Sequence, residues 1–194
     1  MNYSAVKDKY FNSRLLAVTL LGFASGLPLA LSGSTLQAWF TDSGVDIVTI
    51  GFLSLVGQPY VYKFLWSPLL DRFSLPFADR RRGWIIISQS IIISILFLMA
   101  YQSPTKAPLI LGVLAMMLAF ASATQDISID AYRADLLKPR ERGLGAALSV
   151  GGYRIAMLVS GGLALLLADY WGWKLTFFVM AILMGISLAS TVLS

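Results

Sequence analysis

Apolar runs of about twenty residues recur along this chain, and they limit the folds that it can adopt. A bilayer core about 30 Å thick is crossed by ~20 apolar residues of α-helix. A helix that is apolar on nearly every side has no face to turn toward water. Charged residues make up only 13% of the 194 positions, and the mean hydropathy is +0.74. The sequence therefore predicts an all-α, polytopic membrane protein.

Charge clusters and turn residues divide the chain into six predicted transmembrane helices, which follow a polar cytoplasmic segment at 1–13. We expect no cleavable signal, because the first apolar segment is too long for one. Every connector is short, so we expect residues 14–194 to form one helical bundle. The predicted helices cover residues 14–40, 47–70, 84–101, 109–132, 143–168 and 174–194.

Basic residues gather on one side of this predicted topology. The N-terminus and the connectors after the second and fourth helices carry eleven of the fifteen Lys and Arg residues, whereas the opposite connectors carry Lys106 and Lys174. Short loops rich in Lys and Arg stay in the cytoplasm. We therefore expect a cytoplasmic N-terminus. The net charge of +5 then reflects orientation and contact with anionic membrane lipid, not binding of nucleic acid.

A weak internal repeat links the two halves of the predicted bundle. The segment GFLSLVG at 51–57 opens the second helix, and GAALSVG at 145–151 opens the fifth with the same glycine spacing. These two helices are predicted to cross the membrane in opposite directions. Inverted repeats of three plus three helices are common in secondary transporters, so the repeat favours that architecture.

Small residues recur at intervals near four on two predicted helices. Gly22 and Gly26 form a G-x-x-x-G motif, and in lipid such faces permit close helix packing. Pro28 and Pro59 fall inside predicted helices, where each removes a backbone donor and is expected to bend the helix or widen a cavity. Trp39 is expected in the interfacial aromatic belt. A second row of small residues lies on the fifth helix: Gly151, Gly152, Ala156, Ser160 and Ala164.

The fourth predicted helix carries two aspartates inside the membrane. A rise of ~1.5 Å per residue places Asp130 about 12 Å and Asp126 about 18 Å inward from Lys138. Their spacing of four residues puts both on one helix face. A charged residue at the centre of a membrane helix costs ~2.5–3.5 kcal/mol, so such residues usually face a cavity or a partner.

Two interpretations of these aspartates stay open. In the structural one, Asp130 pairs with Arg133, and Asp126 or Asp130 neutralises Lys63 or Arg154 on a neighbouring helix. In the functional one, at least one aspartate carries a proton whose movement is coupled to that of a substrate; the chain has no histidine for this task. Other polar groups would suit a sugar-like or peptide-like solute, namely Gln37, Tyr60, Gln125 and Tyr153.

Cysteine and histidine are both absent, which removes thiolate nucleophiles, disulfides and the usual zinc and copper ligands. We expect no metal, no cofactor and no enzymatic activity. One enzymatic alternative is a membrane phosphotransferase that holds a divalent metal on a D-x-x-x-D pair. That chemistry needs further carboxylates nearby, and the interiors of the other predicted helices contain none.

Several segments resemble the AmpG-type anhydromuropeptide permeases of the major facilitator superfamily, over most of residues 14–175. They include GFASGLPLALSGSTLQAWF, SATQDISIDAYRADLL and ERGLGAALSVGGYRIAMLVSGGLALLLAD. Two signatures shared by the superfamily lie in cytoplasmic connectors and are implied to act in the conformational change. They comprise Asp71, Arg72, Arg80, Arg81 and Arg82, followed by Glu141 and Arg142.

The resemblance implies a proton-driven importer of anhydromuropeptides in the bacterial inner membrane, used in cell-wall recycling. It implies that the first and fourth helices line a cavity, the second and fifth flank it, and the third and sixth face lipid. The family has two six-helix halves and the chain matches the N-terminal one. We therefore expect either that the sequence is a partial product, or that it works with a second six-helix half, which is a C-terminal half or a second copy of the chain. The alternatives are a related acetyl-CoA-type transporter and a regulatory half-permease that does not transport.

Overall fold

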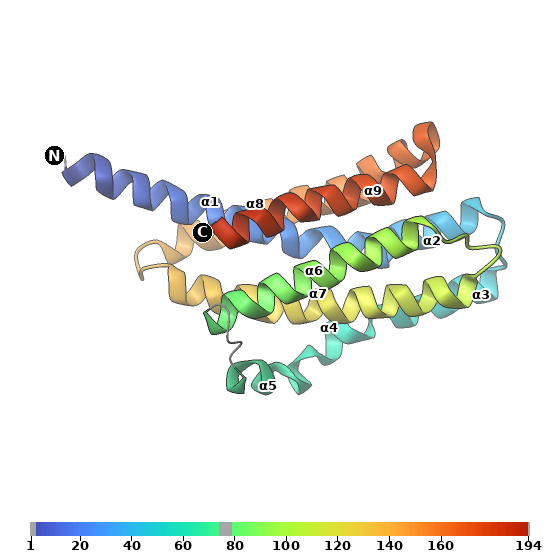
Figure 1. Cartoon of the computed structure of the whole chain (residues 1–194), viewed down its shortest axis with the longest axis horizontal. Coiled ribbons are helices and arrows are strands. Elements are labelled where there is room, and N and C mark those ends of the chain that lie inside the picture. The colour runs from blue at the N-terminus through green and yellow to red at the C-terminus, as the bar shows by residue number, and fades with distance from the viewer. Residues whose placement is uncertain (1–2, 74–78, 194) are drawn as a thin grey trace.

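The computed structural model describes the backbone of residues 3–73 and 79–193, with side chains except those of 3–12 and Arg80. All regular elements in these ranges are helical, as predicted (Figure 1). They are α1 (Tyr3–Ser32), α2 (Ser34–Asp42), α3 (Ile47–Phe52), η1 (Leu53–Gly57), α4 (Gln58–Tyr62), η2 (Lys63–Leu65), α5 (Ser67–Arg72), α6 (Arg80–Ala100), α7 (Pro108–Leu136), α8 (Arg142–Met157), η3 (Leu158–Leu163) and α9 (Ala164–Leu193).

Four helical stretches in the described part are long and apolar enough to cross a membrane: Ser13–Asp42, Arg81–Ala100, Pro108–Leu136 and Arg142–Leu193. The last has 52 residues, and an uninterrupted helix of that length would reach about 78 Å, far beyond a bilayer core. Gly172 interrupts it with φ 80° and ψ 159°, a conformation that glycine adopts without a steric penalty. The chain turns back on itself there, from orange to red in Figure 1.

The prediction of one helix over 47–70 is wrong, although a bend was expected at Pro59. The region consists of short α-helical and 3₁₀-helical turns from α3 to α5. Pro59 and Pro68 each lie in the first turn of a new piece. Proline lacks the N–H donor and clashes with the preceding turn, so it starts helices and does not continue them.

Pro28 does not break the first predicted span. The α1 helix continues through it to Ser32, and the interruption comes at Gly33, whose φ is −110° and ψ is −107°. Immediately after this break, the Thr35 hydroxyl donates a 2.6 Å hydrogen bond to the Ser160 carbonyl in the π-helical turn η3. The interruption thus brings the α2 segment against the neighbouring transmembrane segment.

Close packing of α1 against α8 agrees with the prediction from the small residues. A Cβ atom on Gly22 would overlap the Ser149 carbonyl, and one on Gly26 would overlap the Tyr153 carbonyl. On the facing helix, a Cβ on Gly152 would overlap the Thr19 carbonyl. Backbone therefore meets backbone along this interface, which is the contact that glycine rows permit in lipid.

Polar contacts tie the connectors together at the two ends of the bundle. At one end, on the left in Figure 1, Arg82 donates two 3.0 Å hydrogen bonds to the carbonyls of Thr191 and Val192 near the C-terminus. At the other end, Trp173 Nε1 donates a 2.8 Å hydrogen bond to Asp42. Lys174 Nζ lies there too, 4.6 Å from the centre of the Tyr101 ring. Connectors that are predicted on the same side of the membrane thus lie at the same end of the helical bundle.

Trp39, which was expected in the interfacial aromatic belt, is only 4% exposed. The ring stacks on Trp173 at 5.5 Å and lies 4.9 Å from the Phe177 ring. Trp39 therefore joins α2 to α9 within the hydrophobic core.

Candidate functional site

Asp126 lies at a junction of three segments. The Ser25 hydroxyl on α1 donates a short hydrogen bond to Asp126 Oδ1, and Lys63 Nζ on η2 lies 3.8 Å from Asp126 Oδ2. The Asp126 side chain is 13% exposed and that of Lys63 is 37% exposed. The carboxylate is thus buried with one cation and one hydroxyl as its partners, an arrangement that offsets the cost of placing a charge in the membrane.

Two tyrosines complete the surroundings of this carboxylate. Tyr60 on α4 and Tyr153 on α8 both lie close enough for electrostatic interaction with Asp126, as does Asp130 one turn along α7. Side chains from α1, the broken segment α4–η2, α7 and α8 therefore converge on one position. They belong to the first, second, fourth and fifth predicted helices, for which the family resemblance implies cavity-lining or flanking roles.

The broken segment is held against α7 by an aromatic contact next to Lys63. Trp66 Nε1 donates a 3.2 Å hydrogen bond to the Thr124 hydroxyl, and its ring lies 4.7 Å from the Phe120 ring. Thr124 is two residues before Asp126, so this contact fixes the height of the segment on α7. The 3₁₀ turn at Lys63–Leu65 then places the lysine beside the aspartate.

Asp130 has the partner that the structural interpretation assigns to it. Arg133 Nη2 lies 3.2 Å from Asp130 Oδ1, and the Asp130 side chain is 61% exposed. An exposed pair of this kind is worth little in stability, about 0.2–1 kcal/mol. The two aspartates on this helix face therefore have different environments: Asp126 is buried between helices and Asp130 lies near the surface.

The structure does not bring two predicted residues to this junction. The Arg154 side chain is exposed, and among the described residues the ion pairs of Asp126 and Asp130 are made with Lys63 and Arg133. Gln37 is partly exposed on α2, where its carbonyl accepts a 2.9 Å hydrogen bond from the Thr41 hydroxyl.

Gln125 is fully buried, and both polar atoms of its side chain have no hydrogen-bond partner in the described part of the chain. Gln89 on α6 has the same property. The sequence analysis missed Gln89 and Ser25. The signal for Gln89 was present, because it is the one amide in the apolar run IIISQSIII. A lone serine such as Ser25 gives no such signal.

The residues of the predicted conformational loop fall into several environments. Arg81 lies between two carboxylates: its Nη1 is 3.2 Å from Asp71, and its Nε donates to Asp135 on α7. Glu141 accepts a 3.1 Å hydrogen bond from the Lys138 N–H. Arg82 binds the carbonyls already described. Arg72 and Arg142 are exposed, and the side chain of Arg80 lies outside the described residues.

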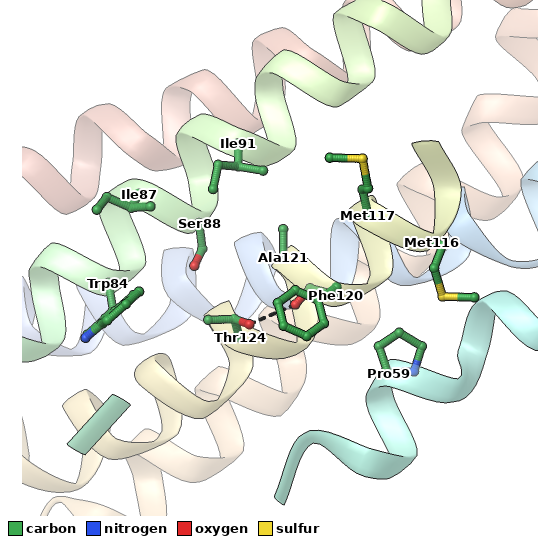
Figure 2. A pocket seen from close by; sticks show the side chains of 10 residues that line it. All are labelled: Pro59, Trp84, Ile87, Ser88, Ile91, Met116, Met117, Phe120, Ala121 and Thr124. Carbon is green, nitrogen blue, oxygen red and sulfur yellow. Dashed lines mark hydrogen bonds between the residues drawn. The ribbon is translucent and has the colours of Figure 1, made fainter. Parts of the chain in front are cut away.

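An apolar pocket of about 450 Å³ lies between α4, α6 and α7, and its lining includes none of the predicted site residues (Figure 2). Its two hydroxyls are those of Ser88 and Thr124, and Thr124 donates back to the Phe120 carbonyl at 2.9 Å. Nothing in this lining suits a polar solute. The pocket is lined by Pro59, Trp84, Ile87, Ser88, Ile91, Met116, Met117, Phe120, Ala121 and Thr124.

The donor set around Asp126 defines its chemistry. No group of three or more acidic side chains that could hold a metal ion occurs among the described residues. The junction offers one carboxylate, one ammonium group and hydroxyls. Such a set can exchange a proton, and it can bind an anionic or hydroxyl-rich solute through Lys63 once the carboxylate is neutral.

Comparison with known proteins decides the family. The model of the Major Facilitator Superfamily matches residues 15–193. The chain belongs to the major facilitator superfamily. With its four candidate spans, this member of the superfamily is a multi-pass membrane protein.

Relatives within the superfamily agree with the resemblance seen in the sequence. The chain is 51% identical over 182 residues to the anhydromuropeptide permease of Escherichia coli K12, and 37% identical over 179 residues to a putative transporter AmpG 4 of Rickettsia felis. A protein of Haemophilus influenzae is 39% identical over 181 residues. These matches cover 90–93% of the chain but only 37–43% of each relative. The chain therefore spans about two fifths of the length of these curated relatives.

Proposed function

We propose that the chain is part of a secondary transporter that imports anhydromuropeptides across a bacterial inner membrane, driven by the proton gradient and without a cofactor. The observation that carries the proposal is the Asp126–Lys63 pair, which places a carboxylate and an ammonium group between converging helices. The similarity to an anhydromuropeptide permease over 93% of the chain supports the substrate class. The imported anhydromuropeptides would serve cell-wall recycling.

The pair provides a route for coupling. While Asp126 is ionised, it neutralises Lys63 across 3.8 Å. When Asp126 accepts a proton, the ammonium loses its partner, and an unpaired charge in the membrane is costly. A carboxylate on the peptide of the substrate then replaces it. Substrate binding and protonation thus favour the same state, which is the requirement for moving both together. Tyr60, Tyr153 and Gln125 add hydrogen-bonding groups for the sugar.

The proposed topology has six passes in a three-plus-three inverted repeat. The turn at Gly172 divides Arg142–Leu193 into two passes, and the short pieces from α3 to α5 form the broken second pass. Interrupted helices next to a site are frequent in secondary transporters, since their free backbone groups line cavities. The excess of Lys and Arg in the N-terminus and in the second and fourth connectors supports a cytoplasmic location for that end.

A second six-helix half is the proposed partner. Alternating access requires two bundles that rock around one site, and the chain spans 37% of the length of the permease that it resembles. The exposed apolar side chains of the broken segment, including Phe52, Val61 and Phe64, offer a face for such a bundle. We propose that this half is a C-terminal six-helix half like that of the related permeases, or a second copy of the chain.

Uptake of labelled anhydromuropeptide tests the proposal in cells that lack their own permease. The chain is expressed alone and together with the C-terminal half of a related permease. We expect uptake with the second half and loss of uptake when a protonophore collapses the gradient. Uptake of acetyl-CoA instead would favour the related transporter group. Absence of uptake in both arrangements would support a regulatory half-permease.

A further inference from the structure

Several buried polar side-chain atoms in the described part of the bundle have no hydrogen-bond partner. Among the described residues, buried side-chain atoms that form no hydrogen bond occur on Tyr60, Gln89, Ser122 and Gln125, and on Arg82 at the end of α6. Gln89, Ser122 and Gln125 are each 0% exposed. Leaving such a group unpaired costs about 1–3 kcal/mol. Four neighbouring side chains of this kind therefore need a common explanation.

The register of three helices places the two glutamines side by side. Leu21 on α1, Ile85 on α6 and Ile129 on α7 pack into one apolar cluster. In Figure 1, α1 and α6 run from the end that holds the N-terminus, and α7 runs back toward it. The next helical turn into the bundle is therefore reached four residues later on α1 and α6, and four residues earlier on α7.

Those positions are Ser25, Gln89 and Gln125. A polar layer thus follows directly beneath the apolar one. Figure 2 supports this orientation of α6: Ser88 points into the apolar pocket, and its neighbour Gln89 is rotated about 100° around the helix, away from that pocket. The two amides therefore lie in the interior toward α1.

Ser122 extends the layer across α7. It precedes Gln125 by three residues and Asp126 by four, so it lies between the faces of both. The Tyr60 hydroxyl interacts with the hydroxyls of Ser122 and Ser32 but forms no hydrogen bond of ordinary geometry in the described part of the chain. The polar atoms thus run from Gln89 through Gln125 and Ser122 to Tyr60, beside the Asp126 carboxylate.

Native proteins satisfy groups of this kind with ordered water, which makes about three hydrogen bonds per molecule. Amide groups provide both donors and acceptors, and the hydroxyls of Ser122 and Tyr60 provide either. We propose that Gln89, Gln125, Ser122 and Tyr60 bind a short chain of ordered water molecules that crosses the bundle next to Asp126. This site is distinct from the apolar pocket. It shares Tyr60 and Gln125 with the groups proposed above to contact the sugar, and the water molecules would occupy it in the absence of substrate.

Solid-state NMR of the chain in lipid bilayers tests the proposal, with the glutamine side chains labelled with ¹⁵N. The sequence has five glutamines, Gln37, Gln58, Gln89, Gln102 and Gln125, so each NH₂ signal can be assigned by substitution. Magnetisation is transferred from water to these groups. We expect transfer to Gln89 and Gln125, which are buried, as well as to Gln102 in the connector after α6.

The variant Gln89→Met keeps the side-chain length and removes the amide. We expect it to reduce water transfer to Gln125 to roughly half or less, because the bridging water loses a partner. The matched variant Ser90→Ala, at an exposed neighbour on the same helix, leaves that transfer unchanged. The unshifted signal of Gln102 reports that each variant is folded.

Two results would overturn the proposal. One is the absence of transfer from water to both buried amides while Gln102 receives it. The other is a direct contact between the amides of Gln89 and Gln125 without transfer from water, which would mean that the two side chains satisfy each other.

Discussion

Lys63 Nζ lies 3.8 Å from Asp126 Oδ2, across the contact between a broken segment and the continuous helix α7. Each residue stabilises the ionised form of the other inside the membrane. Because protein partly shields both groups from solvent, removal of one charge makes ionisation of the other group less favourable.

The variant Lys63→Met is expected to destabilise the chain. It leaves the Asp126 carboxylate with the Ser25 hydroxyl as its described polar contact, and we expect a loss of about 1–3 kcal/mol at neutral pH. The double variant Lys63→Met with Asp126→Asn should recover most of this loss. Thermal unfolding in lipid nanodiscs measures both, with Lys138→Met at an exposed position as the control. Strictly additive losses would contradict the coupling.

Two adjacent glycines provide a matched test of the α1–α8 interface. A Cβ on Gly152 overlaps the Thr19 carbonyl, whereas a Cβ on Gly151 meets nothing within 4 Å. We expect Gly152→Ala to lower the free energy of unfolding by about 1–3 kcal/mol, because two backbones must separate. Gly151→Ala should be neutral, or stabilising by up to about 1 kcal/mol through helix propensity. Equal unfolding temperatures for the two variants would show that the helices do not approach this closely.

Arg81 links the second and fourth predicted spans through Asp71 and Asp135. The variant Arg81→Gln should lower stability by about 1 kcal/mol or less, since both carboxylates are largely exposed. Added salt should reduce the difference from the wild type. Arg72→Gln removes an exposed charge nearby and serves as the control. A loss that is large and independent of salt would indicate a packing role for Arg81 instead.

Asp46 begins α3 and gives a pH-dependent signal outside the membrane. Its carboxylate accepts hydrogen bonds from the Thr49 hydroxyl and the Thr49 N–H, and these lower the pKa of Asp46 below its usual 3.8. A lowered pKa stabilises the cap above pH 3.8, and the contribution disappears as the pH falls through the lower value of the folded state. The Thr49 amide should therefore lose protection from hydrogen exchange in acid. In Asp46→Asn, which keeps an acceptor, protection should not change over this range.

Composition and periodicity predicted the helical class and the long membrane helices, because ~20 apolar residues have few alternatives to a membrane helix. They did not predict the pieces between α3 and α5. The breaks of that segment at Pro59 and Pro68 follow from local backbone chemistry that hydropathy does not record. The Gly22–Gly26 interface was predictable from spacing, since backbone contact needs residues without side chains.

The candidate site was predictable only in part. Helical spacing indicated that both aspartates lie inside the membrane, with Asp126 the deeper one. It did not predict their different exposure, with the Asp126 side chain 13% exposed and the Asp130 side chain 61% exposed. The choice of Lys63 over Arg154 as the partner depends on how the broken segment turns, which no local pattern fixes. The positions of Ser25 and Gln89 near the site depend on the register between helices, which the sequence does not show.

We propose that Asp126 carries the proton that drives uptake. The direct measurement is accumulation of labelled anhydromuropeptide in cells that express the chain with a second six-helix half, for Asp126→Asn and for the control Asp130→Asn. We predict that Asp126→Asn binds substrate but does not accumulate it against a gradient, while Asp130→Asn accumulates it nearly as the wild type does. Normal proton-driven accumulation by Asp126→Asn would contradict the account.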